Sequence, residues 1–309
     1  MTASSTPAAP AAPAAGPSGS PVRAFLRLVT IEHSVFALPF AYLAALSAMH
    51  TQDDHRVRWV DLLLITVAMV AARTFAMAAN RIIDRKIDAR NPRTAGRELV
   101  TGAVSMRTAA TGALAALAIF FLAAGLLSPL CLALAPLAVI PLVVYPYAKR
   151  FTWAPHAVLA LAQTVAPVGS WIAVTGTWSW SAVLLGLAVG AWIAGFDIIY
   201  ACQDVAADQG QGVQSLPARF GVRTALIVAR LVHVVALALF AAYGLAEGFG
   251  PFWAAGLVLT AAAFVYEHSL VRPDDLSKVN RAFFTVNGFV GVAMFCFALA
   301  DLVSRGLRW

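Results

Sequence analysis

Two short acidic stretches carry the side chains in this chain that are most able to do chemistry. The first contains Asn80, Asp84 and Asp88, and the second contains Tyr200, Asp204 and Asp208. Residues four positions apart lie on one face of a helix, so each stretch presents a polar group and two carboxylates together. Paired carboxylates without His or Cys beside them suit a hard cation such as Mg²⁺. The pattern predicts a magnesium site built from both stretches.

The elements that must position these carboxylates are membrane helices. The chain is 61% hydrophobic and 12% charged, with a mean hydropathy of +0.78. Its apolar runs are long enough to cross a bilayer, and none alternates as membrane β-strands do. We therefore expect an all-α integral membrane protein with about nine transmembrane helices. The expected spans are roughly 27–50, 59–83, 108–127, 130–148, 155–175, 181–203, 222–245, 251–269 and 279–304.

The two ends of the chain differ in character. Residues 1–22 are rich in Ala, Pro, Ser and Thr and carry no charged side chain, so they are predicted to be a disordered tail and not a signal peptide. Residues 23–309 form the membrane domain. Cys131, Cys202 and Cys296 have no metal-ligand spacing and are expected to be small buried hydrophobes.

The net charge of +7 is explained by topology and not by nucleic-acid binding. With nine spans, the N-terminal segment and every second loop lie on one side, which holds most basic residues. They are Arg23, Arg27, Arg81, Arg85, Lys86, Arg90, Arg93, Arg97, Arg107, Lys149, Arg150, Arg219, Arg223, Arg272, Lys278 and Arg281, against Arg56, Arg58, Arg305 and Arg308 opposite. This asymmetry predicts a multi-pass protein of the cell membrane with its basic side, and both acidic stretches, in the cytoplasm.

The two stretches also indicate an internal duplication. Asn80, Asp84 and Asp88 map onto Tyr200, Asp204 and Asp208 with one constant offset. The expected repeats, about 27–148 and 155–269, are parallel four-helix units followed by one further helix. The predicted bundle encloses a cytoplasm-facing cavity, capped by the loops 89–107 and 205–221.

Basic residues next to the carboxylates point to a metal-bound diphosphate, since Arg and Lys bind phosphate oxygens while carboxylates hold the cation. The basic residues around the first stretch are Arg85, Lys86, Arg90, Arg93 and Arg97. Structural ion pairs between them and the aspartates remain the alternative. Asp197 shares the face of Asp204 and is either a catalytic or metal-binding group or a hydrogen-bond partner of a neighbouring helix. Lys149 and Arg150 end the fourth span as ligand contacts or as interfacial anchors.

These motifs resemble those of the UbiA-type aromatic prenyltransferases over about residues 23–304. The resemblance lies in Asn80-Arg81-x-x-Asp84-x-x-x-Asp88 with Pro92-Arg93-Thr94-Ala95-Gly96-Arg97, and in Tyr200-x-x-x-Asp204-x-x-x-Asp208 with Gly212-x-x-Ser215. Further similarity lies in the segments 31–40, 147–152 and 166–176. The last segments are similar to the branch that prenylates 4-hydroxybenzoate, and still more to relatives that act on 1,4-dihydroxy-6-naphthoate in menaquinone synthesis.

The resemblance implies Mg²⁺-dependent transfer of a polyprenyl group from an allylic diphosphate to the ring of an aromatic acid, in menaquinone or ubiquinone biosynthesis. It implies metal ligands at Asn80, Asp84, Asp88, Asp204 and Asp208, with Asp197 and Tyr200 assisting. It implies diphosphate contacts at Arg81, Arg93, Arg97 and Lys149 and an acceptor contact at Arg150. Two departures affect diphosphate binding: Arg81 replaces a common Asp, and Gln214 replaces a common Lys.

Other functions remain open at this stage. Haem, a tetrapyrrole alcohol or a glycerol phosphate are alternative prenyl acceptors. A cation transporter would place its carboxylates midway through the spans, and the outer loops 128–130 and 175–180 are short and uncharged. A phosphotransferase of the CDP-alcohol type would need an Asp- and Gly-rich motif that is absent. Between the two acids, the resemblance favours the naphthoate, and so does an Ala- and Arg-rich, Lys-poor composition typical of high-GC bacteria, many of which use menaquinone.

Overall fold

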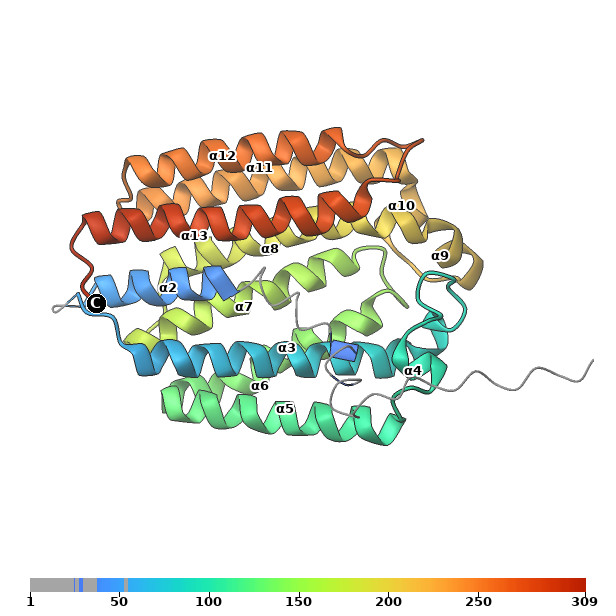
Figure 1. Ribbon diagram of the computed structural model, residues 1–309, viewed down its shortest axis with the longest axis horizontal. Coiled ribbons are helices and arrows are strands. Elements are labelled where there is room, and N and C mark those ends of the chain that lie inside the picture. The colour runs from blue at the N-terminus through green and yellow to red at the C-terminus, as the bar shows by residue number, and fades with distance from the viewer. Residues whose placement is uncertain (1–24, 26–27, 30–37, 53–54) are drawn as a thin grey trace, which may run out of the picture.

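The computed structural model describes residue 25, residues 28–29, 38–52 and 55–309 (Figure 1). The predicted tail, residues 1–22, lies outside this part. The long helices are α2 (Leu38–His50), α3 (Trp59–Asp88), α5 (Met106–Leu127), α6 (Pro129–Ala148), α7 (Pro155–Thr175), α8 (Trp180–Ala201), α11 (Val222–Ala246), α12 (Pro251–Ser269) and α13 (Asn287–Ser304). The described residues contain no β-strand, which confirms the all-α prediction.

Each of the nine expected spans overlaps one of these helices, and the part of 27–50 before Leu38 falls largely outside the described residues. Within the described part, seven helices are long and apolar enough to cross a membrane. The described residues of α2 form 13 residues of helix, and α12 is not among the seven because its last turn carries Glu267 and His268. The chain is a multi-pass membrane protein. The number nine stays a prediction.

Close helix packing rests on glycines of α8. Figure 1 shows α7 and α8 between a layer of α3, α5 and α6 and a layer of α11, α12 and α13. A Cβ atom at Gly186 would lie 2.7 Å from the Thr164 carbonyl oxygen of α7, and one at Gly190 would lie 2.6 Å from that of Ala160. Small residues at such contacts let two membrane helices approach closely. Many apolar side chains remain exposed on the outside, as lipid-facing surfaces require.

Both acidic stretches lie at one end of the bundle, together with α4 (Glu98–Thr101), α9 (Val205–Gln211) and α10 (Leu216–Phe220), while the C-terminus lies at the other (Figure 1). The first stretch lies entirely on α3, as predicted. The second differs from the prediction, because α8 ends at Ala201 and a 3₁₀ turn (Cys202–Asp204) precedes α9. Asp204 has φ −98° and ψ 0°, a tight-turn conformation that interrupts the regular helix.

Candidate functional site

A cavity of about 500 Å³ opens between the two acidic stretches. Asn80 and Asp88 line it from α3, and Tyr200, Asp204 and Asp208 line it from the end of α8 and from α9. The structure therefore brings together two stretches that are distant in sequence, as predicted. Asp84 is 1% exposed and lies behind the cavity wall.

Asp204 is held from the loop that follows α3. Arg93 donates from Nε to Oδ1 at 2.8 Å and from Nη2 to Oδ2 at 2.6 Å, and Asn91 Nδ2 donates to Oδ1 at 2.9 Å. Arg93 Nη1 also donates to the Tyr200 hydroxyl at 3.1 Å, and its guanidinium lies over the Tyr200 ring, 5.1 Å from the centroid. Two parallel hydrogen bonds to one carboxylate fix both geometry and charge.

The charge of Arg93 is reinforced by this arrangement. Burial disfavours the charged guanidinium, but the hydrogen bonds and the charge of Asp204 outweigh it and raise the pKa of Arg93 above its usual value. Arg93 thus remains a cation at every pH at which the protein is handled.

The carboxylates of α3 are also paired with basic side chains. Lys149 Nζ lies 2.5 Å from Asp84 Oδ2, and Arg150 Nη2 lies 3.2 Å from Oδ1. Arg97 Nη1 donates to Asp88 Oδ1 at 2.6 Å. The structural ion pairs that the sequence left as an alternative are present. They do not exclude ligand binding, because Arg93, Arg97 and Lys149 all line the cavity as well.

Asp208 belongs to the loop that closes the cavity on the other side. Ser215 donates from Oγ to Asp208 Oδ2 at 3.0 Å, and the same Oγ caps α10 by accepting from Ala218 N. The backbone N–H of Gln214 donates to the carbonyl oxygen of Lys149 at 2.7 Å. The second loop is thereby joined to the end of α6.

Asp197 pairs with a histidine that the sequence gave no reason to choose. His156 Nδ1 lies 2.6 Å from Asp197 Oδ2, which joins the start of α7 to α8. This is the hydrogen bond to a neighbouring helix that the sequence left open, and Asp197 lines the cavity too. His156 Nε2 is buried without a hydrogen-bond partner among the described residues. A single histidine near a helix start is more typical of packing or capping than of a site, so nothing in the sequence marks His156.

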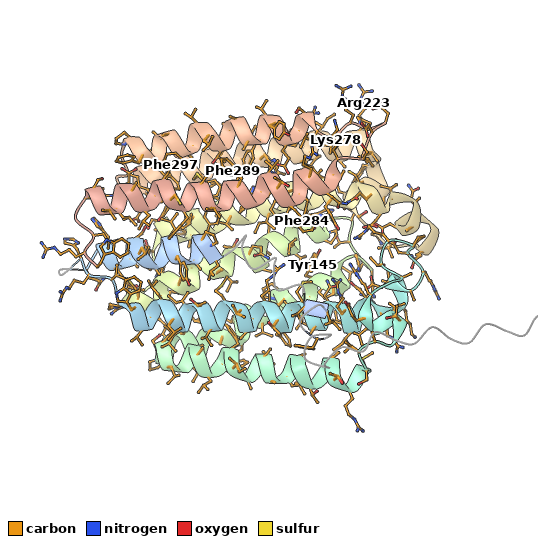
Figure 2. All side chains as sticks on the ribbon, viewed as in Figure 1. Tyr145, Arg223, Lys278, Phe284, Phe289 and Phe297 are labelled. Atoms are coloured by element: carbon orange, nitrogen blue, oxygen red, sulfur yellow. The ribbon has the colours of Figure 1, made fainter. Side chains whose placement is uncertain are left out.

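Arg150, predicted to contact the acceptor, is engaged elsewhere. It donates to the carbonyl oxygens of Pro146 and Ile83 at 2.6 and 2.8 Å, and it does not line the cavity. Arg73, an arginine within the α3 span that was not among the predicted site residues, lines the cavity instead, and its Nε has no hydrogen-bond partner within the described chain. Tyr145, also in the lining, lies in the interior below Phe284 in the view of Figure 2. A buried cation is costly and calls for an anionic partner.

One wall of the cavity is aromatic. Phe283 lies 4.4 Å from Tyr200 and 5.0 Å from Phe196, measured between ring centroids, and Phe284 lines the cavity beside it. The faces of aromatic rings attract cations, and their apolar surface excludes water. This wall could not be predicted from the sequence, since Phe is abundant throughout the chain.

A second cavity of about 320 Å³ adjoins the first. It lies among α3, α5, α6 and α7, and apart from Arg73, Gln163 and Ser170 its lining is almost entirely apolar. Arg73 and Gln163 line both cavities, so they mark the boundary between the polar and the apolar chamber.

The oxygen donors around the first cavity suit Mg²⁺. No group of three or more His, Cys, Asp or Glu side chains within the described residues is close enough to hold a metal by itself. Mg²⁺ in phosphate sites usually takes only one or two carboxylates and completes its shell with phosphate oxygens and water. Asn80, Asp88, Asp204 and Asp208 provide this type of donor set on the cavity wall.

Comparison with known proteins yields relatives of one family. The UbiA prenyltransferase family matches residues 37–290. The chain is 32% identical over 243 residues to the 4-hydroxybenzoate octaprenyltransferase of Aromatoleum aromaticum, covering 79% of this chain and 82% of that protein. It is 33% identical over 245 residues to the enzyme of the same name from Alkalilimnicola ehrlichii, covering 79% and 83%.

Among solved structures, a UbiA homologue from Aeropyrum pernix K1 superposes with a TM-score of 0.79 at 35% identity, covering 88% of this chain and 98% of that one. A UbiA homologue from Archaeoglobus fulgidus, bound to GPP and Mg²⁺, superposes with a TM-score of 0.68 at 19% identity, covering 91% and 99%. The second likeness shows the fold alone.

Proposed function

Because the chain belongs to the UbiA prenyltransferase family, we propose that it transfers a polyprenyl group from an allylic diphosphate to a ring carbon of an aromatic acid. The single observation that carries this proposal is the joint lining of one cavity by both acidic stretches and by Arg93, Arg97 and Lys149. The product belongs to quinone biosynthesis.

The acidic and basic groups have different roles in binding the donor: the first hold the metal ion and the second contact the phosphate oxygens. Asn80, Asp88, Asp204 and Asp208 would hold Mg²⁺, which supplies Lewis-acid neutralisation of the diphosphate when bound. Asp84, the remaining predicted ligand, lies behind the cavity wall and pairs with Lys149. Arg81, Arg93, Arg97 and Lys149 bind the phosphate oxygens, and Tyr200 orients them beside Arg93. Arg81 lines the cavity, which supports a phosphate contact in place of the missing carboxylate.

The reaction begins when the allylic C–O bond breaks and its electron pair leaves with the diphosphate. The basic side chains stabilise the charge that develops on the leaving group. The allyl cation then forms a bond to the ring carbon next to the phenolic hydroxyl, and that carbon loses its proton. Asp197, oriented by His156, lines the cavity and is the proposed base for this proton. The apolar walls exclude water from the cation.

The acceptor is proposed to be 4-hydroxybenzoate. The named relatives act on that acid, and they give no support to the preference for 1,4-dihydroxy-6-naphthoate drawn from the motifs. We assign its carboxylate to Arg73 and not to Arg150, since Arg73 lines the cavity and Arg150 is engaged by backbone carbonyls. The cavity end of the bundle is proposed to face the cytoplasm, because the basic residues gather there.

Product formation by the full chain in membranes tests this function. Membranes would receive geranyl diphosphate, Mg²⁺ and either aromatic acid. We expect prenylated 4-hydroxybenzoate, lost in EDTA and restored by added Mg²⁺. Asp88→Asn and Asp204→Asn should each lower the rate by about 100-fold or more, because each removes one anionic oxygen ligand.

Asp61→Asn is the matched control, since Asp61 lies on α3 at the opposite end and pairs with Arg58. It should keep wild-type activity. Prenylation of the naphthoate alone would show that the assigned acceptor is wrong and the assigned reaction right. No product from either acid would refute the function.

A further inference from the structure

A buried polar network lies behind the aromatic wall of the cavity, among α8, α12 and the start of α13. Its centre is Asn287, which is fully buried. Asn287 Oδ1 accepts from Trp192 Nε1 at 2.7 Å, and Asn287 Nδ2 donates to Glu267 Oε1 at 2.7 Å and to the carbonyl oxygen of Ala282 at 3.0 Å. The amide thus connects three elements by three hydrogen bonds.

None of the reaction steps described above uses a residue of this network. Glu267 is also fully buried, and its Oε2 has no hydrogen-bond partner among the described residues. His233 Nδ1 lies 3.7 Å from that oxygen and 3.0 Å from His268 Nε2. Burying polar side chains inside a membrane bundle costs free energy, and a hydrogen-bonded polar network there fixes the helices that it joins.

What the network holds is an unusual turn. Residues Arg281–Val286 form a π-helix directly before α13. A π-helical turn is rare, and such turns occur mostly at functional sites, where they redirect side chains. Ala282 belongs to this turn. The side-chain amide of Asn287 donates to the carbonyl oxygen of Ala282 and so provides this backbone acceptor with a hydrogen-bond partner.

The π-helical turn carries Phe283 and Phe284, the two rings of the aromatic wall. Phe283 follows Ala282, and its ring contacts Tyr200 and Phe196, while Phe284 lines the cavity next to it. Tyr200 carries the guanidinium of Arg93 on its face and accepts a hydrogen bond from it. Asn287 is therefore connected to the diphosphate end of the cavity through one turn and two rings. Figure 2 shows Phe284 beneath the start of α13, facing the interior that also holds Tyr145.

We propose that Asn287 and Glu267 are positioning residues that hold the Phe283 ring against Tyr200, and that this placement keeps water away from the allyl cation. The inference rests on the proposed function. Water that reaches the cation forms a C–O bond to it, loses a proton and leaves a prenol in place of the prenylated acid. The fraction of donor that ends as prenol therefore measures how well the wall closes.

The first experiment measures the ratio of prenol to prenylated acid made by membranes that contain each variant. Asn287→Ala and Phe283→Leu should each raise this ratio about fivefold to tenfold, the range that one lost positioning contact produces in a rate. Glu267→Gln should stay near the wild-type ratio, because a carboxamide oxygen still accepts the bond from Asn287. Thr260→Val is the matched control on α12, since Thr260 is equally buried and makes none of these bonds.

The double variant Asn287→Ala with Phe283→Leu decides whether Asn287 acts through the ring. If it does, the double variant leaks no more prenol than Phe283→Leu alone. Additive effects on the logarithm of the ratio would overturn the proposal, as would an unchanged ratio in Asn287→Ala.

Amide hydrogen exchange of residues 279–288 provides a readout that needs no turnover. Exchange in this segment should accelerate in Asn287→Ala and stay unchanged in Thr260→Val and Glu267→Gln. Failure of the proposed function would appear as no prenylated acid from the wild type, with the exchange result intact. Unchanged exchange in Asn287→Ala would overturn the network itself, whatever the chemistry.

Discussion

Arg93 serves Asp204 and Tyr200 at once, and this double contact distinguishes it from the other basic residues at the cavity. Arg93, Arg97 and Lys149 line the cavity, as expected from carboxylates and basic residues close together in sequence, and their binding of diphosphate stays a prediction. Arg73 carries no such signal, since an arginine inside an apolar run gives no indication of which way it faces. Arg150, the predicted acceptor contact, bonds to backbone carbonyls, while its neighbour Lys149 lines the cavity.

Replacing Arg93 by lysine should weaken donor binding although the charge is kept. Lysine cannot make two parallel bonds to Asp204 and reach the Tyr200 hydroxyl as well, so we expect KM for geranyl diphosphate to rise about tenfold. Steady-state kinetics at fixed acid concentration measure this. Arg107→Lys is the control, because Arg107 is exposed at the start of α5. An Arg93→Lys enzyme with wild-type KM would show that charge alone suffices.

Exchanging the two candidate acceptor residues should separate their roles. Arg73→Gln should raise KM for 4-hydroxybenzoate by about 10- to 100-fold, the effect of losing a charged hydrogen bond, and leave KM for the donor unchanged. Arg150→Gln should leave KM for the acid unchanged and lower the melting temperature, since it breaks contacts between α3 and α6. The reverse pattern would return the acceptor contact to Arg150.

The C-terminal ends of α3 and α8 have different backbone conformations, although their acidic stretches share one spacing. The four-residue spacing predicted a carboxylate face on each helix, and α3 is indeed continuous to Asp88, but of its two aspartates only Asp88 lines the cavity. At Cys202–Asp204 a 3₁₀ turn intervenes, because the backbone of Asp204 adopts a tight-turn conformation that four-residue periodicity does not reveal. The π-helix at Arg281–Val286 is hidden in the same way, since Asn287, which bonds to Ala282 within it, is itself bonded to Glu267 of another helix.

The contact between α7 and α8 depends on the missing side chain of Gly190. In Gly190→Ala the new Cβ would meet the Ala160 carbonyl oxygen at 2.6 Å, so the helices must separate. We expect a destabilisation of about 1–3 kcal/mol, the usual cost of overpacking, seen as a lower melting temperature in detergent. Gly169→Ala on α7 is the control, because a Cβ there meets nothing within 4 Å. Equal melting temperatures for the two variants would contradict the close contact.

For the whole molecule, hydropathy predicted the helices well, because bilayer-spanning runs are long and apolar. Each expected segment overlaps a helix of the described part, yet α2 and α12 do not qualify as spans by themselves there. Which side the cavity faces was inferred from loop charge, and the parallel repeat from one constant offset. Both stay predictions.

Labelling of single cysteines tests the orientation. In a background with Cys131, Cys202 and Cys296 replaced by Ala, Thr101→Cys lies at the cavity end and Thr177→Cys at the other, and both positions are exposed. A membrane-impermeant maleimide applied to spheroplasts should modify Thr177→Cys at once and Thr101→Cys only after lysis. The opposite order would place the cavity outside the cell.

The pairing of Asp84, Asp88 and Asp204 with Lys149, Arg97 and Arg93 has a thermodynamic consequence. A cation entering alone must compete with these ammonium and guanidinium groups, and an anion entering alone must compete with the carboxylates. When both enter, the carboxylates exchange their basic partners for the metal ion, and the basic side chains exchange their carboxylates for the diphosphate, so no charge is left unpaired. Metal and diphosphate should therefore bind with positive cooperativity, and linkage requires that each tightens the other by the same factor. In calorimetry, Mg²⁺ titrated into protein with inorganic diphosphate should bind far more tightly than Mg²⁺ alone.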